Sequence, residues 1–150
     1  MAELKRFDNG VAEKIGFYVY RLIDPRNGQT FYVGKGKGDR VFQHVQETLK
    51  LSENSEEDNI TLRIKRIRDI HQAGLEVIHV IHRHGMDEKT AFEVEAALID
   101  AYEGLTNMQS GHGSSDYGPM NAQELNAIYT AQELTKDEMT QPHCVIIKIR

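Results

Sequence analysis

Residues 16–44 have the sequence GFYVYRLIDPRNGQTFYVGKGKGDRVFQH. Two runs within it, residues 17–23 and 30–33, are rich in β-branched and aromatic side chains, which favour strands. The intervening residues 24–28, Asp-Pro-Arg-Asn-Gly, include three residue types that adopt turn conformations at low cost. The stretch therefore predicts a β-hairpin.

The second predicted strand leads into a glycine-rich segment, Gly-Lys-Gly-Lys-Gly at residues 34–38. Glycine permits tight turns and the close approach of an anion to the backbone. A helix is predicted to follow over residues 39–51. Arg40 and His44 are four residues apart, so on a helix they share one face and lie one turn apart.

The rest of the chain alternates between helical and strand patterns. Apolar periodicity predicts helices over residues 58–73, 87–103 and 121–137, and β-branched density predicts strands over 75–82 and 144–149. The strand at 75–82 is expected to join the hairpin and to be buried on both faces. The predicted fold class is α/β (α+β): a small, mainly antiparallel three-stranded sheet flanked by helices, with an extra C-terminal helix and strand.

The predicted helix 58–73 carries an apolar stripe and a run of cations. Its isoleucines recur at helical spacing and predict an inward face, which would direct the cations outward: Arg63, Lys65, Arg66 and Arg68. Such charge runs are usually solvated faces, and a contact surface for nucleic acid is the alternative.

Length and composition favour one domain over residues 1–150, with a core at about 16–111 and an extension over 112–150. No apolar run is long enough to cross a bilayer, and the start, MAELKRFDNG, lacks the apolar centre of a secretory signal. The single cysteine, Cys144, fits a reducing compartment. We therefore expect a soluble, intracellular, cytoplasmic protein.

The net charge of −5 is unevenly distributed along the chain. Residues 1–70 carry 13 Lys and Arg against 11 Asp and Glu, whereas residues 71–150 carry 5 against 12. Phosphate binding is a local electrostatic effect that falls off over about 8 to 10 Å at ordinary salt. A basic face in the first half can therefore bind a polyanion, although the whole protein is acidic.

An ordered set of residues along the chain resembles the GIY-YIG nuclease family. The likeness rests on Gly16-Phe17-Tyr18, on Tyr32-Val33-Gly34, and on four later residues in the family's order: Arg40, His44, Glu95 and Asn107. The phrases FYVGKGKGDRVFQH and AFEVEAALIDAYEGLTN look most like the subgroup of LEM-domain and ankyrin-repeat nucleases. Tyr20 lies two residues after Tyr18 and faces the same side of a strand, so either can be the first motif tyrosine.

The resemblance implies an endonuclease that hydrolyses nucleic-acid phosphodiester bonds with one Mg²⁺ (or Mn²⁺) held by Glu95. A carboxylate suits this hard ion, and Arg40 offers a planar fork that matches phosphate oxygens. The other roles implied are these: Tyr18 as the base that deprotonates water, Tyr32 and His44 orienting water and phosphate, and Asn107 fixing the loop beside the metal carboxylate. A nearby cation favours the phenolate, so the pKa of the catalytic tyrosine is expected to lie below its usual value of about 10.

Lys35 and Lys37 are predicted to bind phosphate together with Arg40, because the glycines between them let a short loop fold around an anion. The phosphate-loop pattern GxxxxGK[ST] of nucleotide hydrolases and the dinucleotide fingerprint GxGxxG are both absent.

Other functions remain open at the level of sequence. A non-catalytic nucleic-acid-binding module on the same scaffold is the main alternative, and DNA and RNA are not distinguished. Tyrosines in strands are often packing residues, and Glu93 competes with Glu95 for the metal role on the same helix. A zinc site from His79, His82 and His84 is disfavoured, because strand alternation separates His79 from the other two.

Overall fold

The computed structural model describes residues 4–51 and 61–140, with side chains described up to residue 134. Its elements occur in this order: α1 (Val11–Ile15), β1 (Phe17–Asp24), β2 (Gln29–Gly36), α2 (Arg40–Lys50), α3 (Leu62–Gln72), β3 (Ile78–Met86), α4 (Glu88–Ala101), α5 (Ser114–Tyr117) and α6 (Ala122–Thr140). The chain divides into two compact units, Met1–Gly118 and Pro119–Arg150. Only α6 belongs to the second unit.

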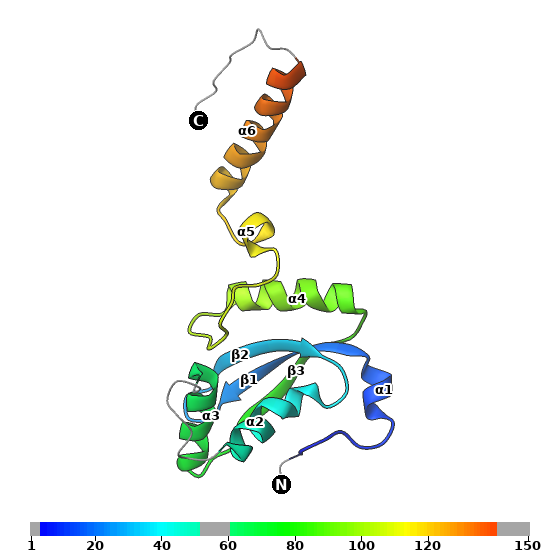
Figure 1. Ribbon diagram of the computed structural model, residues 1–150, viewed down its shortest axis with the longest axis vertical. Coiled ribbons are helices and arrows are strands. Elements are labelled where there is room, and N and C mark those ends of the chain that lie inside the picture. The colour runs from blue at the N-terminus through cyan, green and yellow to red at the C-terminus, as the bar shows by residue number, and fades with distance from the viewer. Residues whose placement is uncertain (1–3, 52–60, 141–150) are drawn as a thin grey trace. The chain divides into compact units, whose positions relative to one another are not determined.

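The predicted hairpin and fold class are confirmed. Strands β1 and β2 pair antiparallel, β3 pairs antiparallel with the other side of β1, and the sheet order is β2-β1-β3 (Figure 1). In the register of β1 with β2, Tyr20 lies opposite Gly34 and Leu22 opposite Tyr32. Because side chains alternate between faces, Tyr18, Tyr20 and Tyr32 project from the same face of the sheet.

Helices cover both faces of the sheet (Figure 1). On one face Tyr18, Tyr20, Leu22 and Phe31 pack against the buried apolar side chains of α2 and α3. On the other face Val19 and Val33 pack against Ala91 of α4. Burial of these apolar surfaces is the main favourable term holding the three layers together.

The hairpin turn is fixed by an ion-pair network that the sequence did not predict. The carboxylate of Asp24 is fully buried and accepts hydrogen bonds from the backbone N–H of Arg26, from the Arg26 guanidinium and from Nε of Arg66, at 2.6 to 3.2 Å. The prediction that Arg66 points outward is therefore wrong. A buried carboxylate needs cationic partners, and α3 supplies one to the turn.

The third strand differs from its prediction. It begins at Ile78 instead of residue 75, because the Leu75 backbone N–H donates to the Ile70 carbonyl and completes the C-terminal turn of α3. It is also largely exposed beyond Ile81, not buried on both faces, since β3 lies at an edge of the sheet. The glycine-rich segment differs too, because β2 continues to Gly36 and only Gly38 has a positive φ, of 61°.

The predicted helices are confirmed with small shifts at their ends. Helix α4 has Asp87 as its N-cap, whose carboxylate accepts a hydrogen bond from the Thr90 backbone N–H. In the second unit, Asn121 and Glu124 exchange hydrogen bonds at the start of α6, in the manner of a capping box. No helix in the described ranges is both long and apolar enough to span a membrane. The strand predicted at 144–149 lies outside the described residues.

Candidate active site

Tyr20, Tyr32 and His44 form an aromatic cluster between the sheet and α2. The hydroxyl of Tyr20 lies 2.6 Å from Nε2 of His44 in a buried hydrogen bond. The Tyr32 ring lies 4.7 Å from the His44 ring and 6.2 Å from the Tyr20 ring, centroid to centroid. His44 is buried because the face of α2 that carries it packs onto the sheet. The structure thus brings three of the predicted side chains, counting Tyr20 as the alternative to Tyr18, into mutual contact.

Gly34 provides the space for this cluster. A Cβ atom at this position would lie 2.5 Å from the hydroxyl oxygen of Tyr20 and 2.6 Å from its Cζ atom. Since Gly34 has no positive φ, its role is to leave room for the tyrosine and not to allow a special backbone conformation. The glycine of the Tyr-Val-Gly motif is therefore explained by its neighbour across the hairpin.

Tyr18 lies beside Tyr20, and its hydroxyl is already used in two hydrogen bonds. It donates to the Gly38 carbonyl at 2.7 Å and accepts from the Val41 backbone N–H at 3.0 Å. These bonds fasten the glycine-rich segment and the first turn of α2 to β1. Burial raises the pKa of the Tyr18 phenol.

Two arginines flank the aromatic cluster. Arg40, at the start of α2, is exposed, and its Nη1 donates to Oε1 of Gln43. Arg63, in the first turn of α3, is half-buried, and its guanidinium carbon lies 5.2 Å from the centre of the Tyr32 ring. The prediction that Arg63 points outward is wrong, and its contact with Tyr32 depends on how α3 packs, which spacing within α3 does not specify.

The electrostatic environment keeps both members of the Tyr20–His44 pair neutral at pH 7. Burial raises the pKa of Tyr20 above its usual value, while the charges of Arg40 and Arg63 act in the opposite direction. Burial, reinforced by the same two arginines, lowers the pKa of His44 to about 3. The expectation of a lowered tyrosine pKa is therefore wrong, because desolvation outweighs the nearby cations.

The outer edge of β2 carries the remaining motif residues. Phe31, Val33 and Lys35 alternate along this edge, and the loop after α4 covers the first two. The Phe31 carbonyl accepts from Thr106, and the Val33 backbone donates to Oδ1 of Asn107 and accepts from its Nδ2, at 3.1 and 2.7 Å. Asn107 thus satisfies the exposed edge in the way a neighbouring strand would.

Glu95 lies next to this edge, on α4. Burial raises the pKa of its carboxyl group, while the charge of Lys35 and a hydrogen bond from the Lys35 backbone lower it. Glu93, two residues earlier, is exposed.

A half-buried carboxylate that burial destabilises gains from a bound cation, and Mg²⁺ needs only one or two protein carboxylates because it keeps much of its water. Glu95 therefore fits a singly ligated Mg²⁺. Among the described residues there is no group of three or more His, Cys, Asp and Glu side chains that could hold a metal, and the zinc alternative gains no support.

The two candidate lysines point to different surroundings. Nζ of Lys35 lies 3.6 Å from a carboxylate oxygen of Glu88 and 3.9 Å from the centre of the Phe92 ring, both on α4. Nζ of Lys37 lies 5.4 Å from the centre of the Phe17 ring. Lys35 therefore lies beside Glu95, and binding of phosphate by the two lysines stays a prediction.

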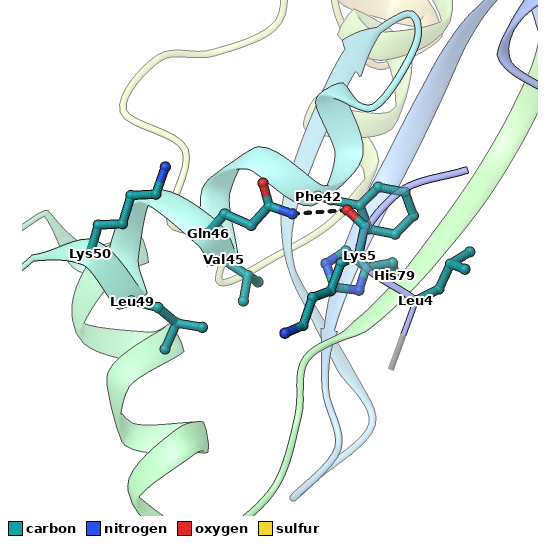
Figure 2. A pocket seen from close by; sticks show the side chains of 8 residues that line it. All are labelled: Leu4, Lys5, Phe42, Val45, Gln46, Leu49, Lys50 and His79. Atoms are coloured by element: carbon teal, nitrogen blue, oxygen red, sulfur yellow. Dashed lines mark hydrogen bonds between the residues drawn. The ribbon is translucent and has the colours of Figure 1, made fainter. Parts of the chain in front are cut away.

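A separate, mainly apolar pocket lies along α2, away from these residues (Figure 2). It is lined by Phe42, Val45 and Leu49 of α2, by Leu4 and by His79, with Lys5, Gln46 and Lys50 at its margin, and Nε2 of Gln46 donates to the Lys5 carbonyl. None of the candidate site residues lines it, so the aromatic cluster is a surface site and not part of this cavity.

The family model described as the LEM-3-like GIY-YIG domain matches residues 17–132. The chain belongs to the GIY-YIG family. The match confirms both the predicted family and its LEM-domain-related subgroup, and it extends beyond residue 111 into α6. No curated protein and no solved structure matches the chain. Membership points to nuclease activity in general and to a nucleic acid as the binding partner.

Proposed function

We propose that the chain is a Mg²⁺- or Mn²⁺-dependent endonuclease that hydrolyses the phosphodiester bonds of DNA. The observation that carries this proposal is the 2.6 Å hydrogen bond between the Tyr20 hydroxyl and Nε2 of His44, next to two arginines. A hydroxyl paired with a neutral imidazole is the arrangement that activates an oxygen for proton transfer. Family membership supplies the reaction class.

Tyr20 and His44 act together as the base. In the tautomer with the proton on Nδ1, Nε2 of His44 accepts the Tyr20 hydroxyl proton while the Tyr20 oxygen takes a proton from the attacking water. The hydroxide forms a bond to phosphorus, the bond to the 3′ oxygen breaks, and solvent protonates the leaving oxygen. This relay needs no phenolate in the resting protein, which agrees with the raised pKa of Tyr20.

We assign the base to Tyr20 and give Tyr18 a positioning role. Both hydrogen-bonding functions of the Tyr18 hydroxyl are engaged with backbone groups, whereas the Tyr20 hydroxyl contacts a titratable side chain. Tyr32 packs against His44 and orients it. Asn107 holds the edge of β2 in place beside Glu95.

The remaining residues bind the charged partners. Arg40 binds the phosphate through its planar fork, assisted by Lys37, and Lys35 neutralises charge beside Glu95. Glu95 would hold the divalent ion, which when bound supplies charge stabilisation at the phosphate and leaving oxygens.

Cleavage of supercoiled plasmid by the purified chain tests this function, with Mg²⁺ in one arm and chelator in the other. Tyr20→Phe should lower the cleavage rate by about 10²-fold or more, because the relay loses its hydroxyl. Tyr18→Phe is the matched control on the same strand face and should keep most of the activity. An inactive Tyr18→Phe with an active Tyr20→Phe would return the base to Tyr18, and salt-dependent retention of plasmid without cleavage would indicate a binding module.

A further inference from the structure

We propose that Arg63 is a second phosphate-binding arginine, which together with Arg40 places the nucleic-acid backbone over the Tyr20–His44 pair. The inference rests on the proposed function, because it specifies how the substrate is held at that site. Arg63 comes from α3, outside the residues on which the family resemblance depends, so the motif does not predict its role.

The position of Arg63 is set by the aromatic cluster. Its guanidinium lies over the Tyr32 ring, and that ring contacts the His44 ring at 4.7 Å. A guanidinium stacked on an aromatic face keeps its N–H groups free at the rim of the plane, where they can donate to phosphate oxygens. The side chain is half-buried, so the fork is both oriented and accessible to solvent.

The charge of Arg63 is not neutralised within the described part of the chain. The ion pairs there involve Arg26, Lys35 and Arg66, and none includes Arg63. Its Nε atom is buried without a hydrogen-bond partner. Arg66, three residues later on the same helix, instead binds the buried Asp24 carboxylate at 2.6 Å. Helix α3 thus presents one structural arginine and one that retains its charge for a ligand.

The same charge acts on the catalytic pair. His44 is surrounded by Tyr20, Tyr32, Arg40, Arg63 and His79, and the two arginines are its charged neighbours. Arg63 therefore keeps His44 neutral and able to accept a proton while it attracts the phosphate.

Three variants of the full chain test this role: Arg63→Gln, Arg63→Lys and the exposed control Lys65→Gln. Affinity for a short fluorescent DNA duplex is measured in chelator over a range of salt concentrations. Arg63→Gln should weaken binding about tenfold and reduce the salt slope by about one, because one phosphate contact is lost. Arg63→Lys should keep the slope and recover part of the affinity, and Lys65→Gln should stay within about twofold of wild type.

A second readout does not depend on DNA. An NMR titration of the His44 ring should give a higher pKa in Arg63→Gln than in wild type and an unchanged pKa in Lys65→Gln. If Arg63→Gln does not fold, Arg63→Lys decides: loss of affinity with an unchanged slope supports the planar fork, and wild-type affinity overturns it.

The failures of the two proposals can be told apart. If the wild type binds the duplex but cleaves with neither metal, the nuclease proposal fails and the affinity series alone judges Arg63. Wild-type affinity and slope in Arg63→Gln overturn the role of Arg63, as does loss of cleavage in Arg63→Gln with unchanged affinity, which would indicate packing only. A wild-type chain that neither binds nor cleaves overturns both.

Discussion

Two carboxylates in this fold are treated in opposite ways. Asp24, at the turn end of the hairpin, is completely buried, and its pKa lies well below the usual range because the Arg26 and Arg66 guanidinium groups donate to it. Glu95, beside the edge of β2, is half-buried, and burial raises its pKa. The first group is satisfied by the fold, whereas the second is left in want of a cation.

The arginines of α3 show the same contrast. Arg66 completes the ion pairs of Asp24, and Arg63 lies on Tyr32 with its Nε unpartnered. Polar groups that a fold satisfies internally contribute stability and specificity, while desolvated groups without full compensation concentrate at functional sites. We therefore expect substitutions at the turn to affect stability and substitutions around Tyr20, Arg63 and Glu95 to affect activity.

Replacing Glu95 should give the largest effect on activity. Glu95→Gln keeps the size of the side chain but loses the charge that would hold Mg²⁺, so plasmid cleavage should fall by about 10³-fold or more. Stability should stay the same or rise, because an amide does not carry the desolvation cost of a carboxylate. Cleavage rates and urea unfolding of the same preparation measure both effects.

Glu93→Gln is the matched control, since Glu93 is exposed and lies about 200° around the helix from Glu95. Lost cleavage in Glu93→Gln with retained cleavage in Glu95→Gln would place the metal on the other side of α4 and would break the contrast with Asp24.

Replacing Asp24 should give the converse result. Asp24→Asn removes one partner of a buried ion-pair network and leaves the two arginines without their carboxylate, which we expect to cost about 3 kcal/mol of unfolding free energy at pH 7. The cleavage rate of the folded fraction should stay within about twofold of wild type. Urea unfolding with the linear extrapolation measures the loss.

The pH dependence of this loss follows from the lowered pKa of Asp24. The ion pairs contribute fully above the unfolded-state pKa of about 3.9, and their contribution disappears as the pH falls toward the lower pKa of the folded state. The stabilities of wild type and Asp24→Asn should therefore converge below about pH 4. His44, with its pKa of about 3, also destabilises the fold in acid, but it does so equally in both proteins. A difference that stays constant down to low pH would show that Asp24 acts by packing alone.

Much of the fold could be predicted from local patterns. The hairpin, α2, α4 and the sheet type follow from period, turn residues and caps, and each of these signals lies within a few neighbouring residues. The exposure of β3 could not be predicted in this way, because its composition does not indicate which position it takes in the sheet. The Asp24–Arg66 pair joins residues 42 positions apart, and no local pattern encodes it.

The site was predicted less completely than the fold. Strand alternation places Tyr18 and Tyr20 on one face, but only the packing of α2 shows which hydroxyl meets His44. Arg63 was expected on a solvated face, since helical spacing gives the direction of a side chain relative to its own helix and not what lies beyond it. Lysines in a glycine-rich segment suggested one anion loop, whereas strand pairing extends β2 through that segment and directs Lys35 toward α4.

Two glycines at opposite ends of β2 offer the finest test of the contrast between the two regions, with the smallest expected effects. Gly28 lies in the turn with φ of 73°, and a Cβ there meets nothing within 4 Å, so Gly28→Ala should cost about 1 kcal/mol through backbone strain and leave cleavage unchanged. Gly34→Ala adds no such strain, but its methyl group would displace the Tyr20 hydroxyl from His44. Cleavage should therefore fall about tenfold, with a comparable cost of about 1 kcal/mol from overpacking. Urea unfolding and cleavage rates of the two variants, measured side by side, separate the causes. Equal activity in Gly34→Ala and Gly28→Ala would mean that the Tyr20–His44 hydrogen bond is not needed for the reaction, and the base would then have to be sought at Tyr18.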